Sequence, residues 1–311
     1  MSVGQATRIE IALTQHAVGR LKAKYSAWSG LVFGVQQIQL DSLDPESNQE
    51  DTLLFCGIRK DKENLSEESH QKTMGDGFFS YTLEDEERRL NVNALTFENV
   101  NMAVSLLETL GVEQNTAQTI AFSLIDWKDA DDVLSDPLYG AEDEYYLGLD
   151  ETLKCKNASL DSLEELLLVK GMTPEILKTI RPYVTIFPKQ GFLTVNINTA
   201  SKEVLRAVAG SVKGSLTNTT EEDADSLVDK MLEYRNEEDF EGHREDWFSQ
   251  FQQQLNPKEQ AIFLTLNRYW TFKSNYFDIK SQGIAGARKV RVDLEAMIDR
   301  TNFSIVALKM R

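Results

Sequence analysis

The first forty residues contain no proline, and this constrains the fold more than any other feature of the sequence. From Ala6 to about Leu40, apolar side chains recur every three or four residues, at Leu13, Ala17, Leu21, Tyr25, Trp28, Val32 and Val35. That spacing is typical of one face of an α-helix. A helix of about 35 residues is about 50 Å long at 1.5 Å per residue, which is longer than a small domain is wide. We therefore expect one end of the helix to extend beyond the globular part.

Strand-forming sequence lies on both sides of a long helix-forming region. Residues 77–83 have aromatic and β-branched character, and residues 89–92 could form their hairpin partner. Further strands are predicted at residues 52–58, 269–280, 287–296 and 301–309. Helical periodicity dominates between them, at residues 96–110, 115–127, 159–169, 173–180, 201–209 and 221–235.

This order predicts an α+β fold. The strands at both ends of the chain would form one antiparallel sheet packed on the long N-terminal helix, and a large all-α domain would be inserted between strands. The expected boundaries are 1–94 for the helix and first strands, 95–267 for the inserted domain, and 268–311 for the last strands.

Charge and hydropathy exclude several classes of protein. The chain carries 33 Lys and Arg against 50 Asp and Glu, a net charge of −17, which opposes binding to nucleic acid and to anionic lipid. Its longest apolar runs, residues 31–35 and 262–266, are far shorter than the roughly 18 residues that cross a bilayer. Cys56 and Cys155 match no metal-ligand spacing, and both two free thiols and one disulfide remain open.

The densest charge lies in residues 126–151, which hold ten carboxylates and one basic residue, Lys128. Crowded carboxylates repel one another unless they extend into solvent or share a hard cation. Aromatic residues interleave with the acids, which favours an ordered segment and hence calcium, although a solvated acidic loop remains the alternative. The candidate ligands are Asp126, Asp129, Asp131, Asp132, Glu142 and Asp143.

Residues 159–182 predict a helix-hairpin-helix. Thr173 is the expected N-cap of the second helix, Pro174 its first residue, and Gly171 lies in the turn. Such hairpins can direct backbone N–H groups at a DNA phosphate, so a DNA-binding module is the alternative function. Only Lys170 is basic at the tip, which favours a role in packing.

Catalysis finds little support in the sequence. No nucleophile elbow, phosphate-binding loop or zinc-protease motif is present. A hydrolase that uses the acidic cluster around a metal has no base or nucleophile that can be named. We therefore predict that the protein is not an enzyme.

Several segments, in order, resemble the minor pseudopilin K family of bacterial type II secretion systems. The segment Tyr-Ser-Ala-Trp-Ser-Gly at 25–30 is similar to a stretch in the family's long helix, and residues 83–93 are similar to its strand pair. The most specific match joins Asp-Trp-Lys-Asp-Ala-Asp at 126–131 to Gly-Ala-Glu-Asp-Glu-Tyr-Tyr at 140–146. Residues 165–188, 195–200 and 274–277 extend the resemblance over nearly the whole chain, whereas residues 213–256 match poorly.

The resemblance implies a pilin-like fold with an inserted α-domain that binds calcium. It implies a place at the tip of a periplasmic pseudopilus, in complex with minor pseudopilins I and J and without nucleic acid. It also implies anchoring in the inner membrane by a hydrophobic N-terminal segment that is absent from this chain, whose first residues, 1–4, look like an expression start.

The expected function is therefore to initiate and cap the pseudopilus in support of protein export. The partner-binding residues would lie where the helix leaves its own sheet, at Ile9, Leu13, Ala17 and Leu21.

Overall fold

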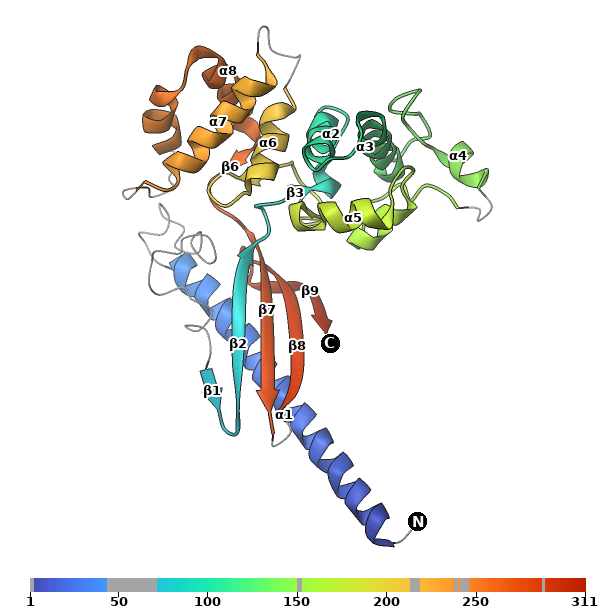
Figure 1. Cartoon of the computed structure of the whole chain (residues 1–311), viewed down its shortest axis with the longest axis vertical. Helices are drawn as coiled ribbons and strands as arrows, with labels where there is room; N and C mark the ends of the chain where they lie inside the picture. Colours follow the sequence, from blue (N-terminus) through green and yellow to red (C-terminus); the bar gives the residue numbers. More distant parts are fainter. Residues whose placement is uncertain are drawn as a thin grey trace. The chain divides into compact units, whose positions relative to one another are not determined.

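The computed structural model describes residues 3–43, 72–149, 153–212, 219–237, 240, 246–286 and 289–311. The chain forms two compact units (Figure 1): Met1–Glu86 with Lys273–Arg311, and Glu87–Phe272. The second unit therefore interrupts the first between two of its strands. These divisions lie several residues from the boundaries expected at 94 and 267.

The first unit is a long helix packed on an antiparallel sheet, as predicted. Its helix α1 spans Val3–Leu43, and the sheet has the strand order β1-β2-β7-β8-β9. The strands are β1 (Lys72–Met74), β2 (Gly77–Asp85), β7 (Tyr276–Ala285), β8 (Val290–Asp299) and β9 (Ser304–Met310). The predicted strand at residues 52–58 lies outside the described residues.

Small residues bring α1 close to the sheet. Ala23 and Ala27 are fully buried, and the Ser281 hydroxyl donates a 2.8 Å hydrogen bond to the Ala27 carbonyl oxygen. A Cβ atom at Gly283 would lie 2.1 Å from the Ala23 carbonyl oxygen, and one at Gly30 would lie 2.1 Å from Ser281 Oγ. Gly283 therefore accepts only glycine at this helix–sheet distance, and a larger residue at Gly30 would displace the Ser281 hydroxyl from its hydrogen bond to Ala27.

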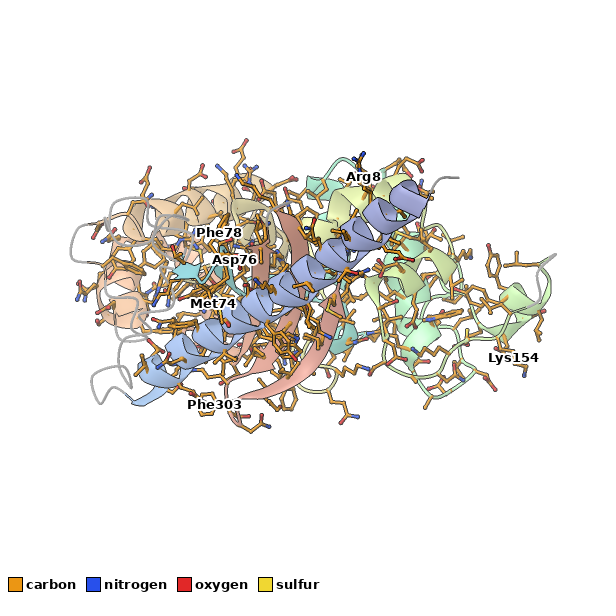
Figure 2. All side chains as sticks on the ribbon, turned by 90° about the horizontal axis from the view of Figure 1, so that it is seen from below. Arg8, Met74, Asp76, Phe78, Lys154 and Phe303 are labelled. Carbon is orange, nitrogen blue, oxygen red and sulfur yellow. The ribbon has the colours of Figure 1, made fainter. Side chains whose placement is uncertain are left out.

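Polar contacts fix α1 at two further places. Near its C-terminal end, the buried guanidinium of Arg300 forms an ion pair with buried Asp41 and donates to Ser42 Oγ at 2.9 Å. Beside the helix, Asp76 forms an exposed 2.8 Å ion pair with Lys22, next to Met74 in the same turn (Figure 2). The exposed pair contributes little to stability, whereas the buried Asp41–Arg300 pair is costly to break, because either charge would then be left in a poorly solvated place.

The second unit is mainly helical and has one continuous apolar core. Its helices include α2 (Val100–Thr109), α3 (Gln114–Lys128), α4 (Asp143–Leu147), α5 (Pro174–Ile180), α6 (Lys202–Gly210), α7 (Glu221–Tyr234) and α8 (Pro257–Thr265). Shorter helical turns are η3 (Val92–Ala94), η4 (Leu163–Leu168), η5 (Arg181–Tyr183), η6 (Asp246–Gln250), η7 (Phe251–Gln254) and η8 (Asn267–Tyr269). Two parallel pairs join β3 (Leu90–Asn91) to β4 (Val184–Thr185) and β5 (Val195–Asn196) to β6 (Trp270–Thr271).

The region that no motif explained, residues 213–256, supplies an aromatic cluster to this core. Tyr234, Trp247 and Phe251 are buried, with ring centroids 4.9–5.2 Å apart. The described part of this region therefore contributes to packing, through large side chains that each remove much apolar surface from water.

Two predictions about strands are wrong. Residues 89–92 do not form a hairpin with residues 77–83, because β2 already pairs with β1 on one side and with β7 on the other. Leu90 and Asn91 pair with Val184 and Thr185 instead. The predicted strand at 269–280 is divided at the unit boundary, since Trp270 and Thr271 pair with β5 and the sheet strand starts only at Tyr276.

The hairpin near residue 170 differs from the prediction in its first helix. That segment is the 3-10 helix η4, whose N-cap is Ser162 and whose Glu165 side chain accepts from the Ser162 backbone N–H at 3.0 Å. The second helix, α5, starts as predicted, with Pro174 at its first turn and the Thr173 side chain accepting from the Ile176 backbone N–H. Gly171 has a positive φ of 84°, which the turn between them requires.

Candidate metal centre and partner surface

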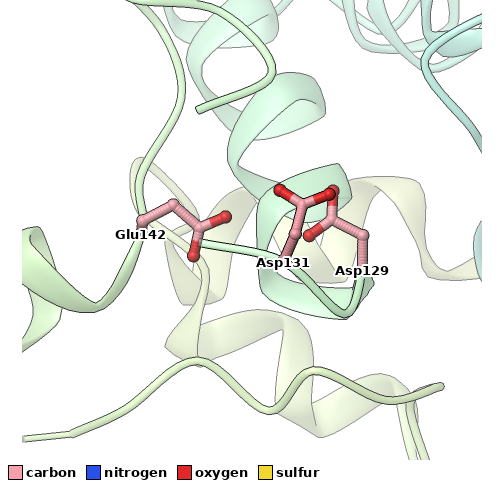
Figure 3. A group of neighbouring side chains, drawn as sticks. All are labelled: Asp129, Asp131 and Glu142. Carbon is pink, nitrogen blue, oxygen red and sulfur yellow. The ribbon is translucent and has the colours of Figure 1, made fainter. Parts of the chain in front are cut away.

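Three of the predicted metal ligands converge after the C-terminal end of α3. Asp129, Asp131 and Glu142 each offer an oxygen atom, and these atoms all lie within 4.8 Å of one another (Figure 3). Asp129 is the C-cap of α3, Asp131 lies two residues later, and Glu142 is the N-cap of α4. The loop between the two helices therefore brings together carboxylates that are thirteen residues apart.

The cluster holds buried oxygen atoms without hydrogen-bond partners. Glu142 is 5% exposed, and neither of its carboxylate oxygens accepts a hydrogen bond. Asp129 Oδ1 is also buried and unpartnered. The nearby thiol of Cys155, a free cysteine, donates instead to the Ala141 carbonyl oxygen at 3.7 Å. Buried polar atoms are usually satisfied, so these oxygens point to a missing partner.

Burial and the negative charges of neighbouring carboxylates set the pKa values in the cluster. Burial raises the pKa of Glu142 to about 7, and the charges of Asp126 and Asp129 raise it in the same direction. Burial and the charge of Asp131 similarly raise the pKa of Asp129 to about 6. Both carboxylates are therefore destabilised in their charged form when no cation lies between them.

The donor set fits a hard divalent cation. It consists of carboxylate oxygens alone, which Ca²⁺ and Mg²⁺ prefer, whereas Zn²⁺ prefers nitrogen and sulfur. A cation bound to Asp129, Asp131 and Glu142 would satisfy the unpartnered oxygens and offset the repulsion among the three charges.

The structure gives the other three predicted ligands different surroundings. Asp126 is fully buried and accepts two backbone hydrogen bonds, from Ser135 at 2.8 Å and from Ala141 at 2.7 Å. Asp143 accepts from the Cys155 backbone N–H at 2.8 Å, which, together with the Lys154 ammonium group, lowers its pKa. Asp132 is exposed to solvent.

The tip of the hairpin faces the acidic loop. The Lys170 ammonium group donates to the Gly140 carbonyl oxygen at 3.0 Å and lies 4.9 Å from the centre of the Tyr145 ring. The Lys170 backbone N–H donates to the Tyr146 hydroxyl at 3.2 Å. The basic residue that could have contacted a DNA phosphate is thus engaged within the domain.

The predicted partner-binding residues on α1 are exposed. Ile9, Leu13 and Leu21 are 54%, 65% and 55% exposed, and Ala17 is exposed as well. In the first unit, the N-terminal part of α1 continues past the ends of the strands (Figure 1), so the sheet does not cover it.

The apolar stripe predicted on α1 lies mostly on its exposed side, so the sequence analysis missed the side that packs on the sheet. Val18, Leu21, Tyr25 and Val32 are each about half or more exposed and follow helical spacing on the side opposite the buried Ala23. The sequence does contain the signal of the buried side, because Ala23, Ala27 and Leu31 are spaced four residues apart and Ile38 follows seven residues later. Distinguishing the buried stripe from the exposed one requires knowing which side packs on the sheet.

No helix among the described residues is long and apolar enough to cross a membrane.

Comparison with known proteins agrees with the motifs. Residues 88–189 match the family described as Type II secretion system (T2SS), protein K. Type II secretion system protein K of Klebsiella pneumoniae is 28% identical over 66% of this chain and 62% of its own length. The protein of the same name from Aeromonas hydrophila is 37% identical over 32% of this chain and 29% of its own length.

The fold agrees as well. A chain in the crystal structure of the GspK-GspI-GspJ complex from the enterotoxigenic Escherichia coli type 2 secretion system superposes with a TM-score of 0.69 at 20% identity, covering 98% of this chain and 99% of that one. In sequence, the chain spans about 60% of the length of the Klebsiella relative. The resemblance predicted from the motifs is therefore confirmed: residues 88–189 match the type II secretion system protein K family, and the curated relatives that match carry the same name.

Proposed function

We propose that this chain is a non-enzymatic minor pseudopilin that lies at the tip of a type II secretion pseudopilus with minor pseudopilins I and J and supports protein export. The observation that carries the proposal is the second apolar side of α1, which the protein's own sheet leaves uncovered. The similarity to protein K in sequence and fold supports it.

A helix that is apolar on two sides favours a second packing partner. One side of α1 buries Ala23, Ala27, Leu31 and Ile38 against the sheet, while Leu21, Tyr25 and Val32 on the other side are more than half exposed. Burial of apolar surface contributes about 25 cal/mol per Å². Helices of similar amphipathic character, as in other pseudopilins, would supply that surface along the whole length of α1.

The inserted unit supports a capping and initiating role. It enters between β2 and β7 and comprises more than half of the chain. A subunit with such an insertion has a much larger head than a helix and sheet alone. We infer that this bulk prevents addition of further subunits on one side, which makes the protein the first subunit of the assembly.

We also propose that the head lies in the periplasm, attached to the inner membrane by a hydrophobic segment preceding α1, and that the carboxylates after α3 bind calcium there. The unpartnered oxygens of Glu142 and Asp129 support the metal assignment. Calcium is the hard cation that accepts many carboxylate ligands in an irregular loop, whereas magnesium demands octahedral geometry. The ion would offset the repulsion among these carboxylates.

A DNA-binding function is not favoured. The Lys170 ammonium group is engaged with Gly140, and the neighbouring surface carries Asp131, Asp132 and Asp136. Phosphate binding needs several cations, and it weakens steeply between roughly 50 and 200 mM salt. We expect no binding of duplex DNA even at low salt.

Substitution on α1 tests the assembly role. Replacing both Leu13 and Ala17 with Asp should abolish co-elution with minor pseudopilins I and J in size-exclusion chromatography, because two charges would enter an apolar helix interface. Gln15→Asp is the matched control, since Gln15 is exposed on a different side of the same turns of α1. Unchanged complex formation by the double variant would refute the proposed role.

A further inference from the structure

We propose that Asp126 and Lys170 are positioning residues that close the loop between α3 and α4 before any cation binds, so that Glu142 already faces Asp129 and Asp131. This inference rests on the metal site of the proposed function but assigns neither residue as a ligand. It also assigns a structural role to the tip of the hairpin between η4 and α5, in place of the DNA contact considered above.

Asp126 joins the middle of the loop to its C-terminal end through one carboxylate. Its Oδ1 accepts from the Ser135 backbone N–H at 2.8 Å, and its Oδ2 accepts from the Ala141 backbone N–H at 2.7 Å. The residue is fully buried on α3, which is itself part of the unit's core. Charge-assisted hydrogen bonds of this kind are about twice as strong as neutral ones. Each oxygen is therefore already committed to the backbone of the loop that leads to Glu142.

The Asp126 carboxylate and the two backbone N–H groups that it binds form a clamp, and there is little space around it. A Cβ atom at Gly140 would lie 2.4 Å from Asp126 Oδ2 and 2.7 Å from the Asp136 carbonyl oxygen. Only glycine therefore allows the loop backbone to approach the carboxylate this closely. The adjacent Ser123 hydroxyl donates to the Tyr139 carbonyl oxygen at 2.9 Å, which holds the same segment against α3.

Lys170, at the tip of the hairpin between η4 and α5, also holds the loop. Its ammonium group donates to the Gly140 carbonyl oxygen at 3.0 Å. Its backbone N–H donates to the hydroxyl of fully buried Tyr146, so the hairpin tip is fixed on α4. The loop is thus held between α3 through Asp126 and the hairpin through Lys170, and Glu142 follows two residues after Gly140.

Substitution of Lys170 distinguishes a positioning role from a purely electrostatic one, because the two roles predict opposite changes in calcium affinity. A lysine near a cation site repels the cation, so Lys170→Met should strengthen calcium binding if the residue acted only through its charge. Positioning predicts the opposite, a calcium affinity at least tenfold weaker by isothermal titration calorimetry. Lys154→Met is the matched control, because Lys154 is exposed and pairs with the Asp143 carboxylate. It should leave the affinity unchanged or raise it.

Hydrogen exchange in EDTA tests the clamp without any metal. Asp126→Asn keeps the size of the side chain but offers one acceptor oxygen for two N–H donors. The backbone amides of Ser135 and Ala141 should exchange at least tenfold faster in Asp126→Asn, and those of residues 138–141 should do so in Lys170→Met. Protection of α6 and α7 should not change, which confirms that the domain remains folded.

The possible outcomes are distinguishable. Unchanged loop exchange in metal-free Asp126→Asn, or stronger calcium binding by Lys170→Met, would overturn the inference. If the unmodified protein binds no calcium, the metal assignment fails, and faster loop exchange in both variants would still establish the clamp.

Discussion

Replacing Glu142 with Gln should stabilise the metal-free protein and yet remove its stabilisation by calcium. Glutamine keeps the shape of the side chain but carries no charge. In the absence of a cation, the charged Glu142 carboxylate is buried beside Asp129 and accepts no hydrogen bond. The variant removes this unfavourable charge and, at the same time, one of the proposed ligands.

The magnitude follows from the pKa of Glu142, which burial raises from 4.5 to about 7. Because one pKa unit corresponds to about 1.4 kcal/mol, the charged form is disfavoured by up to about 3 kcal/mol in the folded state. The folded pKa is the higher one, so the folded protein retains a proton between pH 4.5 and 7 that the unfolded chain releases. Stability is therefore lost as the pH rises through this window, and the loss is complete above about pH 7.

Urea unfolding followed by tryptophan fluorescence, in EDTA at pH 5 and pH 8, measures this effect. We expect Glu142→Gln to gain up to about 3 kcal/mol relative to the unmodified protein at pH 8, and much less at pH 5, where the carboxyl group is mostly protonated. With excess calcium at pH 8 the order should reverse, because only the unmodified protein gains the binding free energy.

Two results would refute the reasoning. Glu142→Gln could destabilise the metal-free protein at pH 8, which would mean that the carboxylate has a favourable partner. It could also show the same difference at both pH values, which would mean that the charge of Glu142 is not the cause. Glu144→Gln, at an exposed position on α4, is the matched control and should change stability little.

Two further predictions concern the first unit. Burial raises the pKa of Asp278 from 3.8 to about 7, against the opposing charge of Lys280. Asp278→Asn should therefore raise stability by up to about 4 kcal/mol at pH 8 and by little at pH 4, and equal effects at the two pH values in urea unfolding would contradict this. Arg300→Met leaves the buried Asp41 carboxylate without its ion pair and should cost about 3–5 kcal/mol in the same assay, most of which Asp41→Asn should restore in the double variant.

The local elements of this protein are largely determined by its sequence. Absence of proline and three-to-four spacing predict α1, and the cap at Thr173 with Pro174 predicts the start of α5. These features act within one or two helical turns, so neighbouring residues contain the information. The order of strand and helix patterns was also sufficient to predict the α+β class, and the order of motifs was sufficient to find the resemblance to the protein K family.

Long-range pairing could not be derived in this way. Leu90 has the character of a strand residue, but β2, the strand before it, is already paired on both sides, and the partner of Leu90 is Val184, more than ninety positions away. A short apolar segment can pair with any exposed edge, so the topology of the whole sheet decides which one it meets.

The same distinction holds for the candidate site. The sequence determined that ten carboxylates crowd between residues 126 and 151, and hence that their repulsion needs compensation. Only the tertiary structure decided that Asp129, Asp131 and Glu142 converge while Asp126 binds backbone N–H groups. The physical reason is that the composition of a segment determines how much charge it carries, whereas the closure of the loop in three dimensions determines which of its charged groups lie close together.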